Sequence, residues 1–97
     1  MENLNVKNNV LLSSIGSGVQ VKSGSNARIG QATLVGGTVT VSNTSITANS
    51  RILLQTATAG GTLGILSYTT IANTSFTINS TSVLDTSTIN WFVLESI

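Results

Sequence analysis

Hydrophobic and polar residues alternate along much of this chain, and the alternation predicts β-strands. In residues 38–42 the side chains of Val39 and Val41 fall on one face of a strand and the hydroxyl groups fall on the other. Residues 75–79 have the same pattern, with Phe76 and Ile78 sharing a face. β-Branched residues dominate these segments and strong helix formers are scarce, which favours strands over helices. Five further segments are predicted to be strands: 31–35, 51–56, 64–68, 69–72 and 89–95.

Short segments rich in Gly, Asn and Ser separate the predicted strands. These residues favour turns because they tolerate turn backbone angles or bond to their own backbone. Short strands at this spacing predict an all-β fold, a small antiparallel β-sandwich or barrel of jelly-roll-like type. The apolar runs 52–54 and 91–94 do not alternate cleanly. We therefore expect both faces of these two strands to be covered, one by a second sheet and the other by a neighbouring subunit.

Residues 31–47 align by residue type with residues 68–84, which raises the question of an internal duplication. The alignment places Val39 on Phe76 and Val41 on Ile78. Two related β-hairpin units would explain it, and so would the shared Ser- and Thr-rich composition. The sequence leaves both explanations open.

The first 30 residues differ from the rest of the chain. They show little alternation and hold three of the four basic residues. We interpret residues 1–30 as an extended N-terminal arm and residues 31–97 as a compact β domain. The arm is too apolar to be a solvated tail, so we expect it to dock on its own trimer axis or on another protein. Its apolar side chains are Leu4, Val6, Val10, Leu11, Leu12 and Ile15.

The composition excludes most catalytic chemistry. The chain has no His and no Cys, and it has 4 basic and 3 acidic side chains. Ordinary zinc, haem, copper and iron–sulfur sites need His or Cys ligands, and the common nucleophiles need a His or a thiol. We therefore expect no enzyme activity, no metal and no cofactor. A net charge of +1 also gives no basic surface for nucleic acid.

The apolar content bears on the surroundings of the chain. The longest apolar runs fall far short of the roughly 18 residues that a membrane-spanning helix needs, so no membrane insertion is expected. The first residues lack the basic start and apolar run of a secretory signal, which predicts a soluble intracellular product. Only 4% of the residues are aromatic, and a domain of this size buries a limited share of its surface. Oligomerisation is therefore the expected source of further burial.

Three charged residues of the β domain are candidates for specific roles. Asp85 and Glu95 are its only acids, and hydrolysis by paired carboxylates would need them about 5–10 Å apart. Asp85 lies in a turn pattern and Glu95 at the end of a strand, which favours structural roles. Arg51 is the only basic residue within residues 31–97. We predict that it forms an ion pair with Asp85, within the chain or between subunits. The alternatives are a bond to a backbone carbonyl and the binding of a ligand such as an acidic sugar.

Four segments taken in order resemble a known kind of domain. They read ATLVGGTVTVSNTSITANSRI at 32–52, GGTLG at 60–64, TSFTINS at 74–80 and DTSTINWFVLE at 85–95. This succession resembles the small β domain of bacteriophage head-fibre and tail-fibre proteins, including virion decoration proteins. The resemblance implies a homotrimeric structural protein on the virion surface, made in the host cytoplasm. Its partners would be copies of itself and the major capsid protein or another virion protein.

On this resemblance the arm would anchor the protein to the capsid and the β domain would form the trimer. Candidate residues for the trimer interface or the core are Ile52, Leu54, Phe76, Trp91, Phe92 and Leu94. The main alternative is a tail-fibre or tail-tip module that binds a host-surface glycan. An ice-binding β protein is a further alternative, suggested by Thr38 and Thr40, although the motif does not recur at the regular period of a solenoid.

Overall fold

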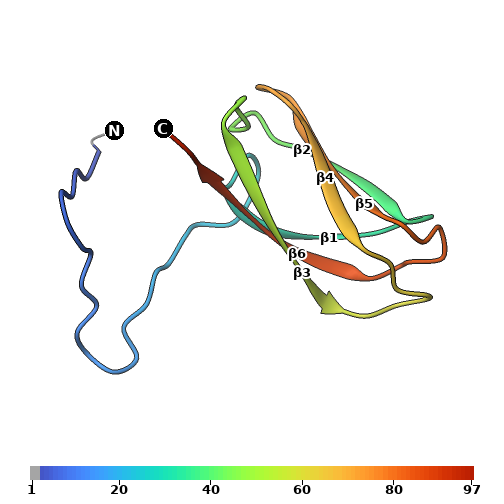
Figure 1. The fold of residues 1–97 in the computed structure, drawn as a ribbon, viewed down its shortest axis with the longest axis horizontal. Helices are drawn as coiled ribbons and strands as arrows, with labels where there is room; N and C mark the ends of the chain where they lie inside the picture. The colour runs from blue at the N-terminus through green and yellow to red at the C-terminus, as the bar shows by residue number, and fades with distance from the viewer. Residues whose placement is uncertain (1–2) are drawn as a thin grey trace.

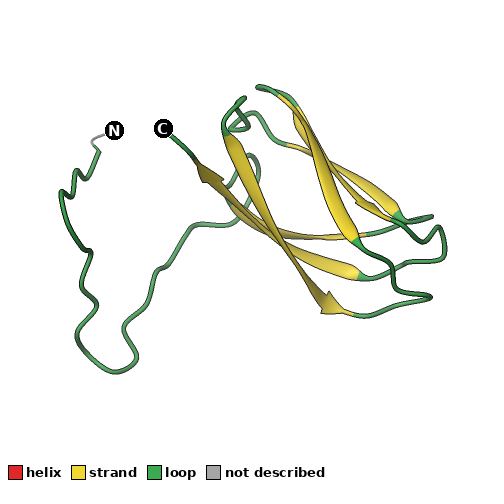
Figure 2. Ribbon diagram, in the orientation of Figure 1, coloured by secondary structure: helices red, strands yellow, loops and turns green. Residues whose placement is uncertain are grey.

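The computed structural model describes residues 3–97, and its regular structure consists of six β-strands (Figures 1 and 2). The strands are β1 (Ile29–Thr33), β2 (Thr38–Ser42), β3 (Ser50–Thr58), β4 (Leu66–Ile71), β5 (Ser75–Ser80) and β6 (Thr88–Glu95). The described residues contain no helix. The predicted all-β fold is therefore confirmed.

The six strands form two small antiparallel sheets. Sheet A has the order β1-β6-β3 and sheet B has the order β2-β5-β4. Every connection except the one from β4 to β5 crosses from one sheet to the other. The two sheets remain separate layers with their own edge strands (Figure 2). The structure is thus the small sandwich among the predicted alternatives.

The strand boundaries follow the alternation, with two differences. The predicted strand 31–35 is β1, which begins and ends two residues earlier, at Ile29–Thr33. Residues 38–42 form β2 as predicted. The predicted strands 64–68 and 69–72 are instead one strand, β4, which pairs with β5 without interruption from Leu66 to Ile71. Tyr68 and Thr69 are adjacent and neither is a turn-forming residue, so nothing in the local sequence ends the strand there.

The core lies between the two sheets and is thin. An aromatic pair joins the layers: Phe76 of sheet B and Trp91 of sheet A lie edge to face, with ring centroids 5.0 Å apart and planes at 71°. Such pairs contribute roughly 0.5–1.5 kcal/mol beyond the area that they bury. The buried apolar residues, drawn from strands and loops of both layers, are Leu34, Ile46, Ile52, Phe76, Ile78, Ile89, Trp91 and Val93.

The two segments aligned as a possible duplication occupy different kinds of structural unit. Residues 31–47 contain β2 and most of β1, which lie in different sheets, whereas residues 68–84 contain β5 and most of β4, which form a hairpin within one sheet. Moreover, β2 and β5 pair with each other, with Val41 opposite Phe76. The fold therefore favours shared composition as the origin of the alignment.

Three loops meet at the end of the sandwich opposite the chain termini (Figure 1). We call this end, made of residues 34–37, 59–65 and 81–87, the distal end. Gly61 has a φ of +63°, and a Cβ at this position would overlap the carbonyl oxygen of Leu84. The loops can therefore pack together only because Gly61 has no side chain.

We predict that Gly61→Ala destabilises the fold more than Gly36→Ala does. Both glycines have positive φ, but a Cβ at Gly36 meets no atom within 4 Å. Gly36→Ala should cost about 1–2 kcal/mol of unfolding free energy, the conformational penalty alone. Gly61→Ala should cost at least about 1 kcal/mol more, since the loops must also move apart. Urea denaturation followed by circular dichroism measures both, and equal losses would contradict the packing role of Gly61.

Candidate functional site

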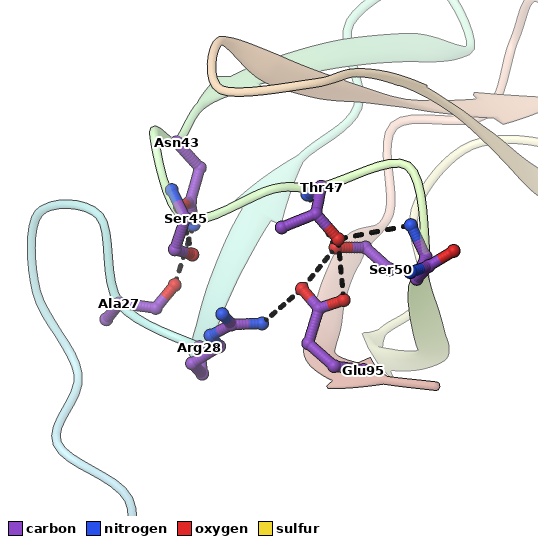
Figure 3. A network of polar contacts seen from close by, with 8 residues as sticks. Ala27, Arg28, Asn43, Ser45, Thr47, Ser50 and Glu95 are labelled. Atoms are coloured by element: carbon purple, nitrogen blue, oxygen red, sulfur yellow. Dashed lines mark hydrogen bonds and ion pairs between the residues drawn. The ribbon is translucent and has the colours of Figure 1, made fainter. Parts of the chain in front are cut away.

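The carboxylate of Glu95 joins three segments at the end of the sandwich that carries the termini. It accepts hydrogen bonds from the Ser50 hydroxyl and the Thr47 hydroxyl, each at 2.7 Å, and from the Arg28 guanidinium, also at 2.7 Å. Figure 3 shows this cluster, which we call the proximal network. It ties the end of the arm and the β2–β3 loop to the last strand.

Asn43 fixes the arm at a second point of the proximal network. Its buried side chain donates from Nδ2 to the carbonyl oxygen of Ala27 at 2.6 Å. Its Oδ1 accepts from the backbone and the hydroxyl of Ser45. In return, Asn26 accepts from the backbone N–H of Thr44 at 3.0 Å. This role of Asn43 could not be predicted, because one Asn in an Asn-rich chain carries no distinctive signal.

Asp85 joins separate segments at the distal end, as Glu95 does at the other end. Its buried carboxylate accepts hydrogen bonds from the Ser80 hydroxyl at 2.8 Å and from the N–H groups of Gly64 and Ser87 at 3.2 and 3.0 Å. These bonds join the β3–β4 loop to the β5–β6 loop. The three loops of the distal end expose apolar side chains to solvent, namely Val35, Leu63, Ile65, Val83 and Leu84.

The structure does not bring Arg51 and Asp85 together, so the predicted ion pair is absent within the chain. Arg51 is exposed at the start of β3, opposite Leu94, whereas Asp85 forms a bridge with Gly61 beyond the other end of that strand. At about 3.3 Å per residue, β3 separates them by more than roughly 20 Å. Among the described residues, the ion pair that forms is Arg28 with Glu95. The prediction overlooked Arg28, which precedes the first strand.

Of the six candidate residues for the interface or the core, four lie in or against the core and two lie on the outer face of sheet A. Ile52, Phe76 and Trp91 are buried in the core, and Leu54 is partly buried against it. Phe92 is partly buried and Leu94 is exposed, and both point away from sheet B. The run 91–94 therefore alternates after all. It looked unbroken because its outward positions are apolar as well.

The outer face of sheet A carries a shallow groove with a volume of about 620 Å³. One apolar row crosses the sheet, formed by Ile29 and Leu53 on either side of Phe92. Val21 and Ser23 of the arm line the same groove. None of its lining residues is charged.

A row of three amides runs beside the apolar row in this groove. Gln31 donates to Asn90 Oδ1 at 2.7 Å, and Asn90 donates to Gln55 Oε1 at 3.2 Å. The three side chains come from β1, β6 and β3 in turn. They form a directional chain that ends in an acceptor on Gln31 and donors on Gln55.

The outer face of sheet B has a different character. Its cross-strand neighbours are hydroxyls and amides, including Thr40 with Thr77 at 2.9 Å and Thr38 with Asn79 at 3.1 Å. This surface is polar and uncharged, as expected for a face in contact with water. Of the two outer sheet faces, that of sheet A is the more apolar.

The six predicted anchoring residues all lie on the exposed arm. Leu4, Val6, Val10, Leu11, Leu12 and Ile15 are exposed, and residues 3–28 form no strand. Within residues 3–97, no group of three or more His, Cys, Asp or Glu side chains is arranged to hold a metal ion. The same part of the chain has no helix able to cross a membrane.

Hydrogen bonding lowers the pKa of both carboxylates. The Ser50 hydroxyl, followed by Arg28 and Thr47, holds the pKa of Glu95 at about 2. Ser87 and then Ser80 hold the pKa of Asp85 at about 2. Both groups are thus ionised in the folded protein at any pH well above 2. Their values in the absence of these bonds are 4.5 and 3.8.

We predict that stability is independent of pH from about 7 to 5 and falls as the pH drops from about 4.5 towards 2. The sign follows because the unfolded chain takes up protons first, at pKa values of 4.5 and 3.8. Glu95→Gln and Asp85→Asn should each lower the melting temperature at pH 7 and reduce the acid sensitivity. Thermal denaturation from pH 7 to 2 measures this. Variants that keep the full acid dependence would contradict the assignment.

Comparison with known proteins gives one match. A family model described as the C-terminal domain of K1 capsule-specific polysaccharide lyase matches residues 26–94, which is more than half of the chain. The match begins at Asn26, in the proximal network, and covers all six strands up to Leu94. Neither a search of curated proteins nor a search of solved structures returned a match.

Proposed function

The chain belongs to the family of the C-terminal domain of K1 capsule-specific polysaccharide lyase, and from this membership we propose that it is a homotrimeric structural protein of a bacteriophage virion. The family supports the resemblance to phage fibre domains at a coarse level, as a phage tail-fibre-type β domain. The finer assignment, a head fibre or capsid decoration protein on the virion surface, is our proposal. We assign no catalytic role to the domain.

The observation that carries this proposal is the apolar outer face of sheet A. Ile29, Leu53 and Phe92 place a row of apolar side chains on one side of a three-stranded sheet whose other side already covers the core, and Leu94 continues it beside Arg51 at the rim. A domain of this size gains much from burying a second apolar surface, at roughly 25 cal/mol per Å². We propose that this face lies at the threefold axis, with the polar face of sheet B towards solvent.

The arm supplies the proposed attachment to the particle. The proximal network fixes residues 26–28 to the domain, Val21 and Ser23 line the groove, and the residues before them extend away from the sandwich (Figure 1). Its exposed apolar side chains are available to the major capsid protein or another virion protein. Leu4 and Val6 lie farthest along the chain from the domain and are the residues that we assign to this contact.

The positions of the aromatic residues give less support to the alternative function, a tail module that binds a host-surface glycan. Of the four aromatic residues, Phe76 and Trp91 are buried and Tyr68 packs against the core. The remaining one, Phe92, lies on the face that we assign to the trimer. In the assembly the partly buried Tyr68 would then be the one aromatic side chain with accessible surface for stacking on a glycan. The structural role is therefore our proposal.

We predict that Leu53→Asp dissociates the trimer and that Ile71→Asp does not. Both residues are exposed in the single chain, at 54% and 63%, but Ile71 lies on β4 of sheet B. A carboxylate placed in the proposed interface must lose its hydration, which should weaken association by at least about tenfold. Light scattering on the purified protein should give three times 10.0 kDa for the unaltered chain and for Ile71→Asp. A monomeric unaltered protein would contradict the proposal.

We also predict that removing residues 1–8 leaves the trimer intact and abolishes attachment to virions. The deleted residues include Leu4 and Val6 but none of the proximal network. Co-sedimentation with particles that lack the protein measures attachment. A chain in which only Leu4 and Val6 are replaced by Ser tests the side chains themselves. Unchanged sedimentation of both variants would exclude the anchoring role.

A further inference from the structure

The groove on the outer face of sheet A is shallow, uncharged and partly apolar, with a volume of about 620 Å³. The apolar row of Ile29, Leu53 and Phe92 lies on one side and the amide row on the other. The groove therefore has room for several apolar side chains next to groups that can bond to a backbone.

The arm carries a segment of matching chemistry that has no partner in its own chain. Val10, Leu11 and Leu12 are consecutive apolar residues, all exposed. No backbone hydrogen bond within residues 3–97 involves residues 3–13. Neither this segment nor the groove lining carries a charge, so bringing them together would bury no ionised group.

We propose that Val10–Leu12 of one copy of the chain occupy the sheet A groove of a second copy. This inference rests on the proposed homotrimer and assigns a segment to its interface. The proximal network holds residues 26–28, Val21 and Ser23 line the chain's own groove, and the residues before them extend away from the sandwich (Figure 1). A neighbouring copy is therefore better placed than the arm's own domain to receive this segment.

The walls of the groove provide hydrogen-bonding groups for an added extended segment. Residues 18–23, which include the groove residues Val21 and Ser23, make no backbone hydrogen bond within residues 3–97. The amide row ends in the acceptor of Gln31 and the donors of Gln55. An incoming backbone needs both donors and acceptors.

The arm is long enough for Val10–Leu12 to reach the groove of a second copy. Leu11 lies ten positions before Val21, and an extended chain of that length spans about 33 Å. The smallest dimension of the molecule is 22 Å. The segment can thus cross from one copy to the next, while Leu4 and Val6 remain free for attachment to the particle.

Disulfide trapping tests the proposal directly, because the chain has no cysteine of its own. Chains with Leu11→Cys and chains with Leu53→Cys, distinguished by tags of different mass, are produced together and oxidised with molecular oxygen. We expect a disulfide-linked heterodimer on a non-reducing gel. The matched control is Leu63→Cys, a leucine at the distal end with nearly the same exposure, 56% against 54%. It should give no heterodimer with Leu11→Cys.

Three results would overturn the inference, and they separate it from the proposed function. A trimer in which Leu53→Cys reacts freely with a soluble thiol reagent would show an open groove, as a saccharide site would need. A chain carrying both substitutions that crosslinks only at monomer mass would show that its own arm fills the groove. In either case the trimer would stand. A protein that is monomeric throughout would overturn the inference and the proposed function together.

The unaltered protein provides a second measurement, which does not depend on the folding of the variants. Its two lysines are Lys7, which precedes the segment Val10–Leu12, and Lys22, which lies between the groove residues Val21 and Ser23. Light and isotopically heavy chains are refolded together and treated with an amine-reactive crosslinker. We expect crosslinked peptides that join Lys7 of one isotope to Lys22 of the other. Crosslinks found only between chains of the same isotope would overturn the proposal.

Discussion

The two carboxylates of the β domain hold together the parts of the fold that its thin core does not reach. A sandwich of two three-stranded sheets has open ends, where loops must pack with little apolar surface to bury. At one end Asp85 accepts hydrogen bonds from two loops, and at the other Glu95 joins the arm, a loop and the last strand. Hydrogen bonds to charged groups are stronger than neutral ones. Two acids in the right places therefore compensate for a limited core.

This arrangement also explains why so few charges suffice in a chain so rich in Ser and Thr. Each carboxylate is satisfied mainly by hydroxyls and backbone N–H groups, and only Glu95 has a cation beside it. Hydroxyl and amide rows on the outer sheet faces form their own cross-strand bonds. Most of the surface can then be polar without charge, which limits electrostatic repulsion between copies, and Arg51, opposite Leu94, is the charged residue on the outer face of sheet A.

The two outer faces of the sandwich differ in chemistry, and its two ends differ in structure. Sheet B presents hydroxyls to solvent, whereas sheet A presents an uncharged groove with an apolar row. The arm leaves from the end where the Glu95 network lies, and the glycine-packed loops form the other end (Figure 1). An assembly built on sheet A would place the arms together at one end and the loops together at the other. That polarity suits a domain that projects from a particle.

Much of the fold was accessible from the alternation of residues, because a strand's side-chain period is fixed by its own backbone. That local rule identified the strands around Val39 and Phe76 and the all-β class. The candidate site was less accessible. Whether Trp91 or Phe92 faces the core depends on the sheet that covers the strand, and the partner of Asp85 depends on loops that meet from distant parts of the chain. The sequence by itself determined which residues form strands and which turns separate them. Only the tertiary structure decided that Arg28 rather than Arg51 forms the ion pair and that sheet A carries the groove, because both depend on contacts between residues far apart in the chain.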